Sequence, residues 1–158
     1  MHSASDATAG ELLDLDNQLC FALHSAARLI IRSYRPILGA LNLTHPQYLV
    51  LLVLWEWARR REKRPTVKAL GTRLDLDSGT LTPLLRRLEA RGMITRTRSK
   101  ADEREVFVRL TPAGLALKRR AQRVPATLLE HSRVSPSDLV KLREQVKQLR
   151  TALTSAPA

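Results

Sequence analysis

The sequence has few of the residues that build disulfide frameworks, metal sites and aromatic clusters. Its 158 residues include one cysteine, Cys20, which excludes an intramolecular disulfide and a cysteine-rich zinc site. Aromatic residues make up only 4%, so the core is predicted to consist mainly of Leu, Val, Ile and Ala. We expect neither a cofactor nor a bound metal ion.

Long hydrophobic runs are also missing. The longest apolar run, residues 48–57, contains Glu56 and is far shorter than the ~20 residues that a membrane-spanning helix needs. The amino terminus shows no basic segment followed by an apolar stretch, so no secretory signal is visible. We therefore expect a cytoplasmic protein with no membrane partner.

Acidic residues are scarce where basic residues are most frequent. The net charge of +12 comes mainly from residues 59–120, which hold 18 Lys and Arg residues against 7 Asp and Glu residues. Residues 1–58 hold 3 against 5, and residues 121–158 hold 6 against 3. A basic middle segment is typical of a module that binds a polyanion such as DNA. Composition alone leaves a merely solvated basic surface equally open.

Hydrophobic periodicity predicts a chain made mainly of helices. Residues 1–10 are small and polar and are predicted to be a disordered lead-in. From Leu12 onward, apolar residues recur at steps of three and four, which predicts a long amphipathic helix reaching Tyr34 or beyond, with a kink or restart at Pro36. Thr44 is the predicted cap of a second helix, which is buried because YLVLLVLWEW is apolar around most of its circumference.

The middle of the chain combines turn signals with short helical segments. Residues 58–65 are predicted to be a charged connector, after which Thr66 caps a short helix. Residues 75–78 form a predicted turn into a helix in which Asp77 or Ser78 accepts from the first-turn amides, and Gly92 suits the left-handed position that ends it. The packing face of this helix is a stripe of leucines at helical spacing: Leu81, Leu84, Leu85 and Leu88.

Two short β-prone segments follow, around residues 93–98 and 105–110, and the polar connection SKADER between them is predicted to form a hairpin tip. The Thr-Pro pair at 111–112 starts another helix, which Pro125 kinks or interrupts. The last helix begins at the cap SPSD, residues 135–138, and carries apolar residues at nearly heptad spacing.

This order of elements predicts a mainly α fold with a small β-hairpin, the winged helix-turn-helix. Residues 44–111 form the predicted DNA-binding winged helix-turn-helix. It is flanked by a dimerisation and sensor helix over residues 11–43 and by dimerisation helices over residues 112–158. An intramolecular bundle of the flanking helices is the alternative.

The polar face of the helix that ends at Gly92 is the candidate reader of the DNA major groove, which is ~12 Å wide and admits one helix. Short hydroxyls and free amides near a helix start suit contacts to phosphates or base edges. Pro83 offers an apolar contact to a thymine methyl or only shapes the helix. Arg87 is predicted to touch the DNA backbone or solvent. The candidate residues on this helix are Ser78, Thr80, Thr82, Pro83, Arg86 and Arg87.

The hairpin tip, RTRSKADER, concentrates four cations within nine residues. An arginine on a narrow projection suits the negative potential of a minor groove. We expect Asp102 to hold the Arg104 guanidinium in one orientation, and a solvated surface ion pair explains the same two residues equally well. The candidate wing residues are Arg96, Arg98, Lys100, Asp102 and Arg104.

The stretch DLDSGTLTPLLRRLEARGMITRTRSKADEREVFVRLTPAG resembles the winged helix of the MarR family of regulators, including its DxR pattern at residues 102–104. The amino-terminal stretch that begins LDNQLCFAL and ends LVLWE resembles the branch of organic hydroperoxide resistance regulators. The resemblance covers roughly residues 12–125. It implies a homodimeric repressor of transcription, not an enzyme, on a pseudo-palindromic double-stranded DNA operator. Its recognition helices would occupy successive major grooves and its wings the flanking minor grooves.

The resemblance also implies a redox switch at Cys20. In this branch an organic hydroperoxide oxidises the amino-terminal cysteine to a sulfenic acid, and the repressor leaves its operator. Two tyrosines normally hydrogen-bond the sulfur across the dimer. This sequence keeps Tyr34, has His45 at the position of the second, and has His24 at a further aromatic position. His24 lies one helical turn from Cys20, where a partly protonated imidazole favours the thiolate, and His45 can replace a phenol as donor.

With one cysteine, the two-cysteine switch through an intersubunit disulfide is excluded. The sulfenic acid must meet a low-molecular-weight thiol, cyclise with a backbone nitrogen or be oxidised further. Two alternatives stay open: Cys20 as an inert buried residue, and release by a reversibly bound aromatic or anionic ligand. A thiol peroxidase is disfavoured, since the sequence contains no resolving cysteine and no visible catalytic constellation.

Overall fold

The computed structural model describes residues 11–155, so the predicted lead-in over residues 1–10 lies outside the described residues. Two short 3-10 turns, η1 (Glu11–Leu13) and η2 (Leu15–Asn17), come first. They are followed by α1 (Leu19–Gly39), α2 (His45–Arg60), α3 (Val67–Leu74), α4 (Ser78–Ala90), β1 (Ile94–Arg98), β2 (Val106–Leu110), α5 (Pro112–Ala121), α6 (Val124–Glu130) and α7 (Pro136–Ser155).

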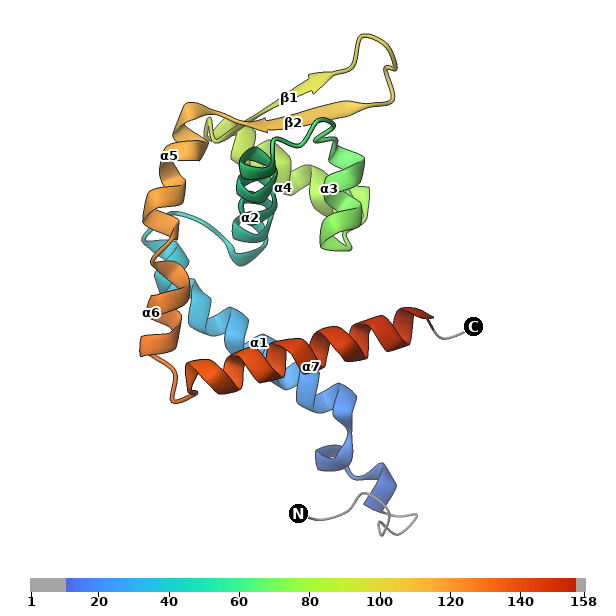
Figure 1. Ribbon diagram of the computed structural model, residues 1–158, viewed down its shortest axis with the longest axis vertical. Coiled ribbons are helices and arrows are strands. Elements are labelled where there is room, and N and C mark those ends of the chain that lie inside the picture. Colours follow the sequence, from blue (N-terminus) through green and yellow to red (C-terminus); the bar gives the residue numbers. More distant parts are fainter. Residues whose placement is uncertain (1–10, 156–158) are drawn as a thin grey trace.

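The arrangement of these elements confirms the predicted winged helix-turn-helix with flanking helices. Figure 1 shows α2, α3, α4 and the hairpin gathered at one end of the molecule, with α1, α6 and α7 at the other. The helix α5 connects the two ends. The tip of the hairpin projects beyond the helices (Figure 1).

The first helix begins later than its apolar spacing predicts. Residues 11–17 form the turns η1 and η2, in which the side-chain amides of Asn17 and Gln18 donate to the carbonyls of Glu11 and Leu12. These side-chain hydrogen bonds compete with a regular helical ladder, so α1 starts only at Leu19. At its other end α1 continues through Pro36 to Gly39.

Capping side chains set the starts of α2, α3, α4, α5 and α7 as the sequence predicts, whereas α6 begins without a side-chain cap. A helix leaves its first amides without internal partners, and a hydroxyl or carboxylate just before it can accept one of them. Each predicted cap accepts an amide in the first turn of its helix: Thr44, Thr66, Asp77, Thr111 and Ser135. The charged connector is shorter than predicted, because α2 extends to Arg60 and ends at Arg61 in the left-handed conformation, with φ 55°.

The hairpin is fastened to the helix-turn-helix at its root. Its strands pair antiparallel, with Ile94 opposite Leu110 and Arg98 opposite Val106. The amide of Val108 donates to the carbonyl of Pro65, so the connector before α3 runs beside β2. Farther out, Arg64 forms an ion pair with Glu105 at 2.6 Å. The root is therefore fixed in place, and the tip between the strands extends from it.

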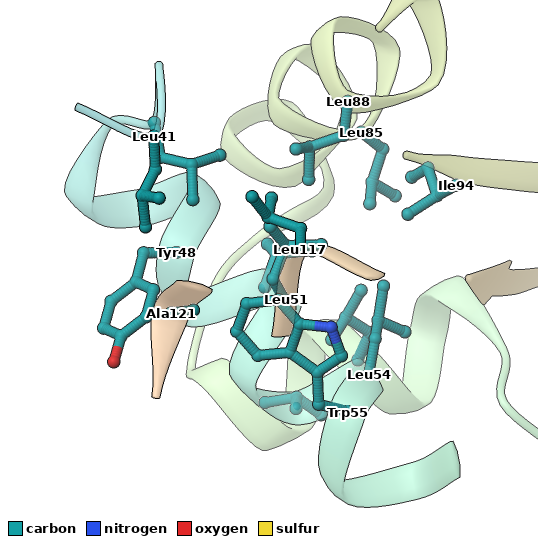
Figure 2. Packing of buried hydrophobic residues seen from close by; sticks show 14 of the residues in the cluster. Leu41, Tyr48, Leu51, Leu54, Trp55, Leu85, Leu88, Ile94, Leu117 and Ala121 are labelled. Atoms are coloured by element: carbon teal, nitrogen blue, oxygen red, sulfur yellow. The ribbon is translucent and has the colours of Figure 1, made fainter. Parts of the chain in front are cut away.

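The core forms around α2 and is mostly aliphatic, as the low aromatic content predicts. Leu51 and Leu85 are completely buried, and Figure 2 shows the cluster to which Trp55 belongs, with residues of α2, α4, β1 and α5. The indole N–H of Trp55 donates to the carbonyl of Gly114 at 2.9 Å. This buried hydrogen bond ties α2 to the first turn of α5.

The flanking helices contribute little to this core. Helix α1 buries only Leu38, and α7 buries none of its residues. The predicted alternative, an intramolecular bundle of these helices, would cover their apolar faces, whereas many of their large side chains are exposed. The exposed residues include Leu19, Leu29, Ile30, Val140, Leu142 and Leu153.

Gly114 provides a test of the junction between the hairpin and α5. A Cβ atom at this position would lie 2.1 Å from the carbonyl oxygen of Met93, so Gly114→Ala must displace backbone. We expect the free energy of unfolding to fall by about 3 kcal/mol, measured by urea denaturation. The control is Gly39→Ala, where an added Cβ meets nothing within 4 Å and is expected to leave stability unchanged or slightly raised. Equal stabilities of the two variants would contradict this packing.

Candidate nucleic-acid interface and cysteine site

Helix α4 turns one face to the core and the other to solvent. Its predicted leucine stripe is buried at Leu81, Leu85 and Leu88, while Leu84 is half-buried. The predicted DNA-contacting residues lie on the remaining surface: Ser78, Thr80, Pro83, Arg86 and Arg87 are exposed, and Thr82 is half-buried. Packing of the leucine stripe thus decides which side chains α4 offers to a partner.

The first turn of α4 is occupied by the Asp77 carboxylate. One carboxylate oxygen accepts the Thr80 amide at 2.8 Å, and the other accepts the Thr80 hydroxyl at 2.8 Å. The amide hydrogen bond first, and then the hydroxyl, hold the pKa of Asp77 below its ordinary value. The expectation that free amides attract a phosphate here stays a prediction for the other amides of this turn. The Thr80 amide already has a partner, and that partner carries negative charge.

Three of the predicted wing cations, Arg98, Lys100 and Arg104, are exposed at or near the hairpin tip. Asp102 accepts the backbone amide of Arg104 at 3.0 Å. Within residues 11–155 no ion pair joins the Asp102 carboxylate to the Arg104 guanidinium, so the predicted pairing is wrong. Asp102 instead shapes the tip as a turn residue, and the guanidinium is left for other contacts.

Arg96, the fourth predicted wing cation, is held by α4. Its Nε and one of its terminal nitrogens donate to Oε2 of Glu89 at 2.9 and 2.6 Å, and its backbone amide donates to Oε1 at 3.0 Å. These hydrogen bonds, the side-chain ones first, hold the pKa of Glu89 below its ordinary value. The Arg96 guanidinium therefore fixes β1 against α4. Sequence reasoning missed Glu89, because one acid on a polar helix face does not reveal its partner.

The wing and the helix-turn-helix border one concave surface. A hollow of about 590 Å³ lies between α3, the first turn of α4 and the hairpin tip. Lys68 and Ser78 line one side of it, and Arg104 lines the other. The structure thus brings predicted residues of the helix and of the wing to the same surface.

Cys20 lies on the first turn of α1 and is exposed. Tyr34 follows 14 residues later on the same helix, which corresponds to about 21 Å along the axis. The ring centroid of Tyr34 stands 5.1 Å from that of His45 and 6.0 Å from that of Tyr48. Within one chain, the structure therefore joins Tyr34 to His45 but keeps both far from Cys20.

The Tyr34, His45 and Tyr48 side chains form a cluster of neutral hydrogen-bonding groups. Burial lowers the pKa of His45 and raises the pKa of Tyr34. Burial, and then the neighbouring Tyr34, raise the pKa of Tyr48 to about 12. At neutral pH each group is uncharged and has a hydrogen to donate. Sequence reasoning missed Tyr48 because it lies in the apolar run of α2 and so looks like a core residue.

Comparison with known proteins places the chain among transcription regulators. Residues 32–120 match the family described as "Transcriptional regulator SarA/Rot". The chain is 48% identical over 141 residues to the organic hydroperoxide resistance transcriptional regulator of Bacillus subtilis (strain 168), covering 89% of this chain and 88% of the relative. It is 45% identical over 151 residues to the HTH-type transcriptional regulator TtmR of Methylorubrum extorquens (strain PA1), covering 91% and 74%.

Solved structures show the same fold. Reduced AbfR bound to DNA superposes with a TM-score of 0.74 at 32% identity, covering 94% of this chain and 100% of that one. Wild-type MarR from E. coli superposes with a TM-score of 0.65 at 26% identity, covering 84% and 96%.

The fold and the basic surface define a winged-helix regulator of transcription, not an enzyme. The chain belongs to the MarR family, in the branch of organic hydroperoxide resistance regulators, and has one cysteine. Over residues 11–155, no helix is long and apolar enough to cross a membrane.

The Glu89–Arg96 contact predicts a pH-dependent contribution to stability. A carboxylate with a lowered folded-state pKa stabilises the fold above its unfolded pKa of ~4.3, and this contribution is lost as the pH falls through the folded value. Glu89→Gln is expected to lower the free energy of unfolding by about 1 kcal/mol at pH 7, because both side chains are partly exposed. The difference should vanish in acid. Urea denaturation at neutral and acidic pH tests this, with Glu130→Gln at an exposed α6 position as control. A loss that persists in acid would argue against the ion pair as its cause.

Proposed function

We propose that this protein is a homodimeric repressor that binds a pseudo-palindromic DNA operator and releases it when an organic hydroperoxide oxidises Cys20. The observation that carries the DNA-binding half is the exposed face of α4 beside a wing tip with Arg98, Lys100 and Arg104. In support, the related AbfR has been crystallised bound to DNA. A regulator must meet its operator, so we place the protein in the cytoplasm.

A second copy of the chain is the proposed partner of the flanking helices. Exposed leucines and isoleucines along α1, and further apolar residues along α7, form faces that one chain leaves uncovered. A two-fold axis through these helices would direct two α4 helices toward successive major grooves, one helical turn or ~34 Å apart. The spacing between the two α4 helices would then depend on how α1 and α7 pack.

The sensor is proposed to form between the two subunits. Tyr34 and His45 of one subunit would face Cys20 of the other, because within one chain about 21 Å of helix separates Tyr34 from Cys20. The contact between the Tyr34 and His45 rings supports a shared role for these two donors. His24, one turn after Cys20 on α1, is the proposed group that favours the thiolate.

The proposed chemistry is a two-electron oxidation of sulfur. The Cys20 thiolate attacks the terminal oxygen of the hydroperoxide, the O–O bond breaks, and the sulfur becomes a sulfenic acid. The organic peroxide is reduced to an alkoxide, which takes a proton and leaves as the alcohol. Neutral Tyr34 and His45 would offer hydrogen bonds to the Cys20 sulfur. A low-molecular-weight thiol can then condense with the sulfenic acid to give a mixed disulfide and water.

Wing contacts to phosphate predict a steep salt dependence of DNA binding. Each phosphate contact that is lost reduces the slope of log affinity against log salt by about 1. Replacing both Arg98 and Arg104 with Ala should weaken binding and flatten the slope by up to about 2 per wing, measured by fluorescence anisotropy at several salt concentrations. Arg59→Ala, at an exposed position of α2, is the control. Salt-independent binding, or none, would instead favour an architectural dimerisation protein.

Cys20→Ser separates redox sensing from ligand sensing. Graded cumene hydroperoxide should release the wild-type protein from DNA in a mobility-shift assay, with a gain of one oxygen atom at Cys20 by mass spectrometry. The Ser variant should stay bound at the same dose. Its release would refute sensing by Cys20 and favour the reversible ligand, which a thermal-shift screen of aromatic carboxylates under reducing conditions would then test.

A further inference from the structure

At the start of α4, the N-cap Asp77 and the first-turn residue Thr80 form hydrogen bonds that fix which of their atoms donate and which accept. Asp77 accepts the Thr80 amide with one oxygen and the Thr80 hydroxyl with the other, each at 2.8 Å. An ionised carboxylate can only accept hydrogen bonds, so the hydroxyl proton of Thr80 points toward Asp77. In every other direction the Thr80 oxygen offers lone pairs alone.

Ionisation of Asp77 preserves this polarity at neutral pH. The hydrogen bonds from the Thr80 amide and then from the Thr80 hydroxyl hold the pKa of Asp77 below its ordinary value. Both side chains are exposed on the same turn. This turn therefore presents acceptor atoms and a negative charge, which suit a hydrogen-bond donor and repel a phosphate.

Major-groove donors are few. Adenine presents its N6 amino group and cytosine its N4 amino group, whereas guanine and thymine present acceptors. We propose that Asp77 and Thr80 read the exocyclic amino group of an adenine or a cytosine in each half of the operator. This specificity rests on the proposed DNA binding, and it adds Asp77, so far only a helix cap, to the residues that read bases.

Asp77→Asn is predicted to invert the polarity of the pair. Asn caps a helix as well as Asp, so α4 should keep its start. Its amide oxygen would accept the Thr80 amide, and its amide nitrogen would donate to the Thr80 oxygen. The Thr80 hydroxyl proton is then turned outward, and the pair becomes a donor that prefers the acceptor edges of guanine or thymine.

The experiment starts from duplexes that the full-length wild-type protein selects from a randomised pool. Each adenine or cytosine of the selected duplex is replaced in turn by an analogue that lacks the amino group, purine or pyrimidin-2-one. At one position per half-site this change should weaken wild-type binding about three- to tenfold. Thr80→Val should lose that sensitivity, and Asp77→Asn should select guanine or thymine there. Thr127→Val, on α6, is the control and should keep the wild-type preference.

Two results would overturn the proposal. The first is wild-type affinity that no amino-group deletion changes. The second is a Thr80→Val protein that binds every sequence more weakly and with a shallower salt slope, which would identify a phosphate contact. Thermal unfolding of each variant shows whether it is folded. Absence of salt-dependent binding to any duplex would overturn the proposed function itself, and this specificity with it.

Discussion

The burial of α2 is the constraint on which the rest of the structure depends. Val50 and Leu51 are fully buried at its centre, and Trp55 reaches across to the backbone of α5. Figure 2 shows leucines of α4 and α5 converging on this helix. Because the leucine stripe of α4 packs against α2, the hydroxyls and arginines on the other face of α4 point toward solvent. The surface offered to DNA therefore follows from the position of the core.

The cations of the winged helix fall into two groups, those that form an ion pair with an acid and those that do not. Glu89 engages Arg96 and Glu105 engages Arg64, and both pairs fix the hairpin to its support. Glu56 engages Arg73 in the same way between α2 and α3, and it also pairs with Arg60 one turn farther along α2. The cations near the tip have no such acid among the residues that the structure describes. A phosphate backbone is the polyanion that such cations suit.

The proposed sensor and the DNA surface belong to different ends of the molecule. Cys20 begins α1, whereas Tyr34 and His45 meet near the junction of α1 with α2, which carries the core of the winged helix. A change at the sulfur that alters the packing of α1 against a second subunit would thus act on the base of the DNA-binding unit. Within one chain about 21 Å of helix separates Cys20 from Tyr34. Such a switch therefore needs the second subunit of the dimer.

Local signals let the sequence determine much of this fold. A cap and its amide lie three residues apart, so Thr66 or Thr111 can be recognised without knowing the tertiary structure, and the leucine stripe of α4 is equally local. The family resemblance placed Cys20, Tyr34 and His45 in one proposed site. Apolar spacing alone extended α1 too far, because the side-chain hydrogen bonds of Asn17 and Gln18 favour turns before it.

Only the tertiary structure decided which polar groups meet. Glu89 and Arg96 lie on different elements, and Asp102 prefers a backbone amide to the guanidinium two residues away. Tyr48 joins Tyr34 because α1 and α2 pack together. The physical reason is that hydrophobic spacing and helix capping act within a few residues. A side-chain partner, by contrast, is fixed by distances that exist only after the helices and the hairpin have packed around α2.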